Sequence, residues 1–269
     1  MAKKRKKNLR IIGVIPARLG SQRLARKVLR EIRGQLLIEH VYRRVQKSAL
    51  LDELWIATDS DEVKQACEKR GLSVLMTSAQ HASGTDRIHE VMKNKKADIY
   101  VNIQGDEPLV RPEHMKILLE PFFSRKDVPV ATLKTRMDAE EALSPNGVKV
   151  VTDSEGWALY FSRARIPFNR EGLTPYVIYK HLGFYAYTAE ALEKFHRLPA
   201  SRLEQMEKLE QLRLMENGIP IFVSETVFDT IGVDTEEDLQ RAVELLAKET
   251  NSRKTLRAKI SMSGRKQGV

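Results

Sequence analysis

Residues 99–108, Ile-Tyr-Val-Asn-Ile-Gln-Gly-Asp-Glu-Pro, decide the fold of this chain. A short apolar run with β-branched residues predicts a buried strand, and Gly105 and Pro108 bring that strand to an end. Two carboxylates, Asp106 and Glu107, follow at its C-terminal tip. In open α/β sheets, ligands bind outside the carboxyl ends of the strands, where a carboxylate suits a hard cation such as Mg²⁺. By itself, such a pair is more often a solvated acidic loop.

Outward from this stretch, the first half of the chain alternates strands with helices. Gly71 directly follows the predicted helix at 61–70, a position where glycine commonly ends a helix. The alternation predicts an α/β fold with a mostly parallel central sheet and helices on both faces. The predicted strands are 11–15, 54–57, 74–76 and 99–103, and the predicted helices are 37–48, 61–70 and a segment near 86–93.

The second half has a different rhythm. Strands predicted at 128–132, 148–152, 158–162 and 183–187 follow one another without a helix between each, which indicates a mixed or antiparallel extension. A helix at 203–215 places Leu209 and Leu212 toward the core, and a strand at 221–224 precedes a closing helix at 235–247 capped by Thr235. No linker demands a split, so we expect one domain over 11–249 with an inserted lobe over about 125–200.

The composition of the chain argues against a nucleic-acid surface on its body, a membrane span and an internal disulfide. The net charge of +10 is concentrated in residues 1–10 and 250–269, which hold twelve Lys and Arg and no acid, so 34 basic residues face 36 acidic ones in the body. We therefore read the two ends as basic, solvated tails rather than as a nucleic-acid surface on the body. No apolar run reaches the length of a membrane span. A single cysteine, Cys67, excludes an internal disulfide and suits the cytoplasm.

Several polar loops could carry chemistry. Residues 16–27 follow the first strand and combine glycine, serine and several cations, a composition suited to a triphosphate, although no Gly-Lys-Ser/Thr element is present. On spacing alone, a basic surface loop explains this segment equally well. Thr58-Asp59, 83–87 and 231–235 are each explained first of all as helix caps.

In this order, however, these segments closely resemble the sugar-acid cytidylyltransferases, and in particular the CMP-Kdo synthetases (3-deoxy-manno-octulosonate cytidylyltransferases). The resemblance spans residues 11–245. The matching segments are Pro16-Ala17-Arg18, Ser21, Arg23-Leu24, Lys27, Ala57-Thr58-Asp59, Ser83-Gly84-Thr85-Asp86-Arg87, Asn102-Ile103-Gln104-Gly105-Asp106-Glu107-Pro108, 145–151, 160–167, 181–187, Leu203-Glu204, Glu207, 209–213 and Gly232-Val233-Asp234-Thr235.

The resemblance implies a Rossmann-like nucleotidyltransferase fold, a homodimer formed through the inserted lobe, and transfer from CTP to the anomeric hydroxyl of Kdo for lipopolysaccharide synthesis. It implies that Arg18, Lys27, Asp106 and Asp234 are catalytic, with Mg²⁺ on the two aspartates and the triphosphate on the two cations. It places the cytosine and ribose at Ala17, Thr58, Ser83, Gly84 and Thr85. It places the sugar acid at Arg87, Gln104, Arg163, His181, Tyr185, Glu210 and Gln211.

This chain departs from the family pattern in three places. The family's Leu-Pro-Gly-Lys-Pro-Leu is here Leu24-Ala25-Arg26-Lys27-Val28-Leu29, its next Gly-Lys-Pro is Gly34-Gln35-Leu36, and its Glu-His is Glu204-Gln205. A glycine position often requires a positive φ, which Arg26 would adopt at a cost. We therefore expect a less pre-formed loop and a raised KM for CTP.

Two alternatives stay open. The substrate could be a related sugar acid, either an amino-substituted Kdo or a sialic-type acid, although 161–163, 181–183 and 209–211 favour Kdo. The chain could instead be a non-enzymatic binder that uses its basic tails, but the presence of both Asp106 and Asp234 and the near-neutral body argue against that function.

Overall fold

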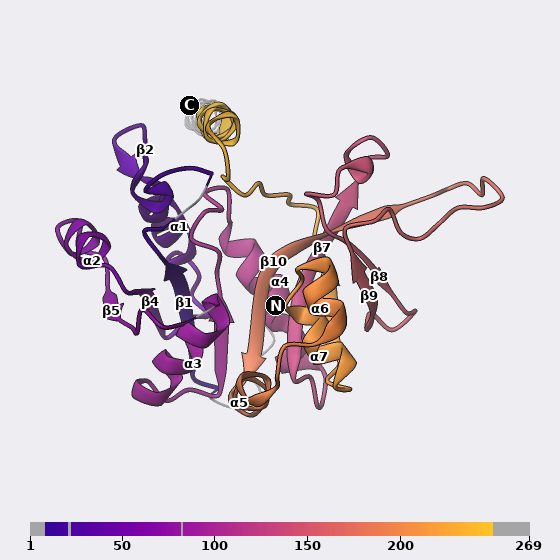
Figure 1. Ribbon diagram of the computed structural model, residues 1–269, viewed down its shortest axis with the longest axis horizontal. Coiled ribbons are helices and arrows are strands. Elements are labelled where there is room, and N and C mark those ends of the chain that lie inside the picture. The colour runs from indigo at the N-terminus through magenta and orange to yellow at the C-terminus, as the bar shows by residue number, and fades with distance from the viewer. Residues whose placement is uncertain (1–8, 21–22, 82, 250–269) are drawn as a thin grey trace, which may run out of the picture.

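A mostly parallel sheet organises the protein (Figure 1), for which a computed structural model describes residues 9–20, 23–81 and 83–249. Its strand order is β11-β7-β10-β6-β1-β4-β5, and in this row only β10 runs antiparallel to its neighbours. The strands are β1 (Ile11–Ala17), β4 (Glu53–Thr58), β5 (Val74–Met76), β6 (Ile99–Asn102), β7 (Val130–Met137), β10 (Ile178–Thr188) and β11 (Ile221–Glu225). The antiparallel pair β8 (Lys149–Thr152) and β9 (Ala158–Ser162) extends from β10.

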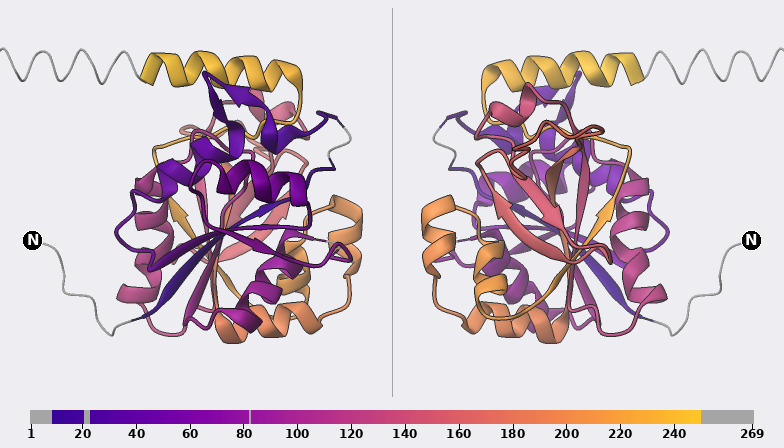
Figure 2. Two further views of the ribbon diagram at one scale, coloured as in Figure 1. Left: turned by 90° about the vertical axis from the view of Figure 1, so that its left-hand side faces the viewer. Right: turned by 90° about the vertical axis from the view of Figure 1, so that its right-hand side faces the viewer.

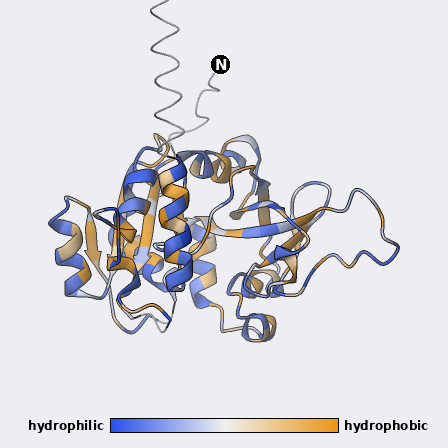
Figure 3. Ribbon diagram, turned by 90° about the horizontal axis from the view of Figure 1, so that it is seen from above, coloured by the Kyte–Doolittle hydropathy of each residue, from blue (hydrophilic) through white to orange (hydrophobic). Residues whose placement is uncertain are grey.

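Helices cover both faces of the sheet, and the alternation of side chains along the strands explains why. Along β1, Ile11 and Ile15 face one core and Ile12 and Val14 face the other, and all four are fully buried. Figure 3 shows hydrophobic residues concentrated in the strands and hydrophilic residues on the outer helices. The helices are α1 (Leu37–Val45), α2 (Asp61–Glu68), α3 (Gly84–Asn94), α4 (Pro112–Ser124), α5 (Ala189–Arg197), α6 (Arg202–Glu207) and α7 (Gln211–Glu216). The predicted fold class is confirmed.

Two helices and one break were not predicted. No element was expected at α4, a helix that contains the buried Pro121, or at α5, which follows directly on the long strand β10. The single helix predicted at 203–215 is wrong, because Lys208 adopts a left-handed conformation with φ of 54° and separates α6 from α7. Leu209 and Leu212 are nevertheless buried, as expected.

The closing helix, at 236–249, lies across one end of the molecule in both views of Figure 2. Thr235 caps it as predicted: its Oγ1 accepts the N–H of Asp238 at 3.1 Å, and its own N–H donates to the Asp238 carboxylate at 2.9 Å. Leu239, Ala242 and Leu246 pack in a separate small core with the segment that follows β1. That segment includes the hairpin of β2 (Glu31–Ile32) and β3 (Gln35–Leu36).

Both predicted tails lie outside the described residues, apart from Leu9 and Arg10, which directly precede β1. Arg10 forms an ion pair with Glu53, so this one basic residue belongs to the folded body. None of the helices in the described ranges is long and apolar enough to cross a membrane.

Candidate active site

A cavity of about 720 Å³ opens at the carboxyl ends of the central parallel strands. Three chain segments form most of it: the loop after β1, the start of α3 and the loop after β6. It brings together nine of the predicted site residues, while Thr58, Thr85, Arg163, His181, Tyr185, Glu210 and Gln211 do not line it. The nine residues are Ala17, Arg18, Lys27, Ser83, Gly84, Arg87, Gln104, Asp106 and Asp234.

Two aspartates from distant parts of the chain meet on one side of this cavity. The N–H of Val233 donates to the backbone carbonyl of Asp106 at 2.9 Å, which holds the two loops together. The Lys27 ammonium lies between the carboxylates, 2.5 Å from Asp106 Oδ2 and 2.9 Å from Asp234 Oδ1. Burial lowers the pKa of Lys27, but the two carboxylates, Asp106 foremost, outweigh this effect and raise it overall.

The aspartate pair has the oxygen ligands that a divalent cation requires. Mg²⁺ takes oxygen ligands and is commonly held by one or two carboxylates together with substrate phosphates. Asp106 and Asp234 supply such oxygens from two loops, and a cationic group, the Lys27 ammonium, already occupies the space between them. The neighbouring Glu107 differs, because burial, with a further contribution from Asp106, raises its pKa to about 8. Glu107 is therefore mostly protonated at neutral pH.

Glycines allow the loops around the cavity to approach one another. A Cβ added to Gly105 would lie 3.1 Å from the carbonyl oxygen of Pro16, and one added to Gly84 would lie 3.4 Å from the Pro16 ring. Ser83 caps α3 through a capping box with Asp86, so the predicted cap is confirmed. The N-terminus of α3 thus borders the cavity, where it favours an anion. Arg18 is exposed and has no ion-pair partner in the described ranges.

The loop after β1 has the strain that its sequence predicted. Arg26 adopts a left-handed conformation with φ of 54° and ψ of 32°, the region that glycine enters most easily. Its guanidinium forms an ion pair with Glu62 on α2. Lys27 follows directly, in the 3₁₀ turn Lys27–Leu29.

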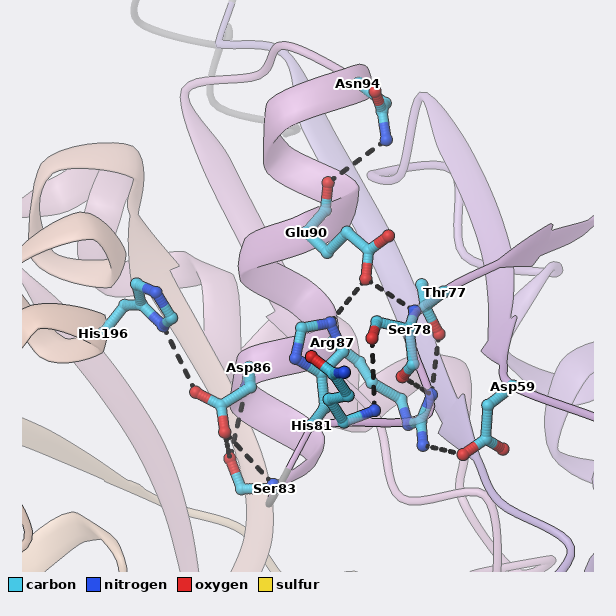
Figure 4. Close-up of polar contacts among 11 residues, drawn as sticks. Asp59, Thr77, Ser78, His81, Ser83, Asp86, Arg87, Glu90, Asn94 and His196 are labelled. Carbon is cyan, nitrogen blue, oxygen red and sulfur yellow. Dashed lines mark hydrogen bonds and ion pairs between the residues drawn. The ribbon is translucent and has the colours of Figure 1, made fainter.

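Arg87 is buried beside the cavity and is fully engaged with the protein (Figure 4). Its guanidinium donates to Asp59 Oδ2 at 2.6 Å, Thr77 Oγ1 at 2.7 Å and the Ser78 carbonyl at 3.2 Å. These bonds tie α3 to the ends of β4 and β5. Thr58 is also buried, and its Oγ1 accepts the N–H of Ser60 at 3.2 Å in the turn before α2.

A second polar cluster lies behind the cavity, between the end of β6, β10 and α7. Thr85 links it to α3, because its hydroxyl donates to Glu210 Oε2 at 2.7 Å. Gln104 Nε2 donates to the Gly183 carbonyl at 3.1 Å. His181 Nε2 lies 3.0 Å from Thr132 Oγ1, and burial lowers the pKa of His181 to about 3, so its ring is neutral.

This cluster holds buried polar atoms that have no hydrogen-bond partner within the described part of the chain: the Tyr185 hydroxyl, Gln211 Nε2 and Asn102 Oδ1. Tyr185 is the register partner of Asn102, so their side chains share one face of the sheet. Sequence reasoning missed Asn102, although an amide within the apolar run 99–103 was a visible signal. Orphaned buried polar atoms are rare in native proteins and commonly mark functional sites.

Arg163 lies apart from both groups. Its Nε donates to the Glu207 carbonyl at 2.8 Å and its Nη1 to the Pro145 carbonyl at 3.0 Å. The Glu207 carboxylate in turn accepts the Ser162 hydroxyl at 2.6 Å and the Arg163 N–H at 2.9 Å. These contacts join β9 to the end of α6, so the side chains of Arg163 and Glu207 stabilise the fold here.

Comparisons with known proteins show which family this chain resembles in sequence and fold. The sequence pattern of the cytidylyltransferase family matches residues 12–226. The chain is 50% identical over 238 residues to a 3-deoxy-manno-octulosonate cytidylyltransferase of Koribacter versatilis, covering 88% of this chain and 90% of that protein. It is 53% identical over 239 residues to the enzyme of that name from Acidobacterium capsulatum, covering 89% and 97%. A solved structure of CMP:2-keto-3-deoxy-manno-octonic acid synthetase in complex with CTP is 45% identical with a TM-score of 0.86, over 89% of this chain and 99% of that one.

Proposed function

The chain belongs to the cytidylyltransferase family, among its 3-deoxy-manno-octulosonate (Kdo) members, and from this premise we infer that it joins CTP to the anomeric hydroxyl of Kdo. The products are CMP-Kdo, an activated sugar for lipopolysaccharide synthesis, and pyrophosphate. The observation that carries this function is close similarity along nearly the whole chain to enzymes of that name, including one solved with CTP.

The reaction is a displacement at the α-phosphorus of CTP, which depends on positioning and charge neutralisation more than on a covalent nucleophile. We assign the triphosphate to Arg18, Lys27 and the N-terminus of α3, which face the same cavity. We assign Mg²⁺ to Asp106 and Asp234; when bound, it would supply positive charge at the reacting oxygens. Ala17, Ser83 and Gly84 line the remaining wall, where the cytosine and ribose would fit.

The sugar acid is assigned to the polar cluster at β10 and α7. The Tyr185 hydroxyl and the Gln211 amide offer hydrogen-bond donors to a polyhydroxylated acid, and neutral His181, whose Nε2 contacts Thr132, offers its other ring nitrogen as an acceptor. The absence of protein partners for Tyr185 and Gln211 among the described residues supports their availability to a ligand. Arg87 supports the site by holding its wall, since its guanidinium bonds to the protein itself, whereas the Arg163 guanidinium joins β9 to the end of α6.

We further propose a cytoplasmic homodimer. The segment between β9 and β10 (163–177) projects from the body in Figure 1 and exposes Phe168 and Leu173, whose exposed fractions are 85% and 71%. Large exposed apolar side chains on a projecting segment favour contact with a second copy. Light scattering on the intact protein and on Phe168→Glu tests this: we expect a dimer that the substitution weakens, and a monomeric intact protein would contradict it.

Pyrophosphate release with CTP, Mg²⁺ and a panel of sugar acids tests the function. We expect Kdo to be the best substrate, and faster release with an amino-substituted Kdo or a sialic-type acid would redirect the substrate assignment.

Asp106→Asn and Asp234→Asn test the metal assignment. Each should lower kcat at least a hundredfold, because loss of a hard anionic ligand removes several kcal/mol of transition-state stabilisation, on the order of 3 kcal/mol. Glu236→Gln is the matched control, since this exposed carboxylate lies two residues from Asp234 and pairs with Arg30. Ordinary turnover in either aspartate variant would refute the assignment.

A further inference from the structure

The Lys27 ammonium occupies the position between Asp106 and Asp234 that a metal ion would need. It lies within 2.9 Å of an oxygen of each carboxylate, and the lysine side chain is only 14% exposed. Arg23 adds a second cation, 2.8 Å from the other oxygen of Asp234. The two negative charges of the aspartate pair are thus matched by two positive side-chain charges.

Two carboxylates held this close require a counter-ion. The backbone bond from Val233 to Asp106 holds their loops together and so keeps the two side chains close to each other. In a partly buried site, like charges at short range repel strongly because water screens them less. Lys27 removes that repulsion in the free protein.

We propose that Lys27 is the resident counter-ion of the aspartate pair and competes with the divalent cation, which binds the pair only when the lysine leaves it. This proposal rests on the assignment of Asp106 and Asp234 as the metal ligands. A divalent cation added beside Lys27 and Arg23 would give the pair two excess positive charges, whereas exchange with Lys27 halves that excess.

The triphosphate of CTP gives the displaced ammonium a new partner. Lys27 lines the same cavity as Arg18 and the start of α3, and its flexible four-carbon stem allows the ammonium to turn toward a phosphate. Nucleotide binding would therefore release the aspartates for the metal. The free protein, in contrast, binds a divalent cation weakly.

Mn²⁺ binding to the nucleotide-free protein, measured by electron paramagnetic resonance, tests this exchange without reference to turnover. Lys27→Gln should bind Mn²⁺ at least tenfold more tightly than the unmodified chain. Arg26→Gln is the matched control, because it removes a neighbouring charge that pairs with Glu62 and does not touch the aspartates. We expect its Mn²⁺ affinity to stay within threefold of the unmodified value.

A second readout is thermal unfolding. Without metal, Lys27→Gln should melt at a lower temperature because the carboxylates repel, and Mn²⁺ should raise its melting temperature more than that of the unmodified chain. Equal or weaker Mn²⁺ binding by a folded Lys27→Gln protein overturns the exchange. The metal assignment itself fails if no variant binds Mn²⁺ and Asp106→Asn retains turnover. Failure of the exchange alone looks different, because Mn²⁺ then still binds but no more tightly to Lys27→Gln than to the unmodified chain.

Discussion

Replacing the buried amide of Asn102 should make this protein more stable. Asn102 lies at the end of β6, is 5% exposed, and its Oδ1 has no hydrogen-bond donor among the residues that the structure describes. A buried acceptor without a partner costs about 1–3 kcal/mol. Leucine has the same branching and the same number of side-chain heavy atoms, and the register partners of Asn102, Val14 and Tyr185, belong to a hydrophobic core cluster. We expect Asn102→Leu to raise the free energy of unfolding by about 1–2 kcal/mol.

Urea unfolding followed by circular dichroism measures this change, provided that the slope with denaturant stays constant. Tyr100→Phe is the matched control, because Tyr100 lies on the same face of the same strand and its hydroxyl is satisfied. It donates to the Lys95 carbonyl and accepts the Ala97 N–H, both at 2.7 Å. This control should lose about 1 kcal/mol.

The same variant also has a functional readout. If the unpaired amide is retained for the sugar acid, Asn102→Leu should raise the KM for Kdo at least tenfold and leave the KM for CTP within twofold. A destabilisation of more than about 1 kcal/mol would refute the argument, because it would show that the amide is satisfied in the free protein.

Three further changes test other parts of the structure. Ala25→Pro combined with Arg26→Gly should lower the KM for CTP several-fold in steady-state assays, because it removes the left-handed arginine and pre-forms the loop; an unchanged KM would contradict this. Glu249→Gln should lower the free energy of unfolding in urea by about 2 kcal/mol, since this carboxylate, 18% exposed, bridges two arginines and anchors the closing helix; a loss under about 0.5 kcal/mol would count against that anchor. Burial lowers the pKa of His114 from its ordinary value of 6.5, so the stability gained from the neutral ring should be complete above pH 6.5 and be lost as the pH falls further. Urea unfolding from pH 7.5 to 5 measures this loss, and His114→Gln should make the free energy of unfolding less dependent on pH over that range.

The fold could be predicted from the sequence wherever burial in the core requires a regular pattern of apolar residues. Residues 99–102 formed β6 because Ile99, Tyr100 and Val101 bury apolar side chains on both faces of a central strand, and Gly71 ended its helix with φ of 68°. Patterning failed where two signals conflicted. Pro121 interrupts the apolar sequence of α4, and Lys208 breaks an otherwise regular helical pattern at a residue that seldom adopts φ above zero.

The candidate site was also predicted only in part from the sequence. By itself, the sequence determined where strands end, and so it located the tip loop Gln104-Gly105-Asp106. The resemblance to the cytidylyltransferases singled out the other candidate loops and predicted a costly positive φ at Arg26, where the family has a glycine. Only the tertiary structure decided which side chains meet. Lys27 bridges Asp106 and Asp234, 79 and 207 residues away, because long-range contacts depend on how strands and loops pack and not on local propensity. Packing likewise left Asn102 Oδ1 without a hydrogen-bond donor among the described residues, since the order of strands in a sheet fixes what each buried polar atom faces.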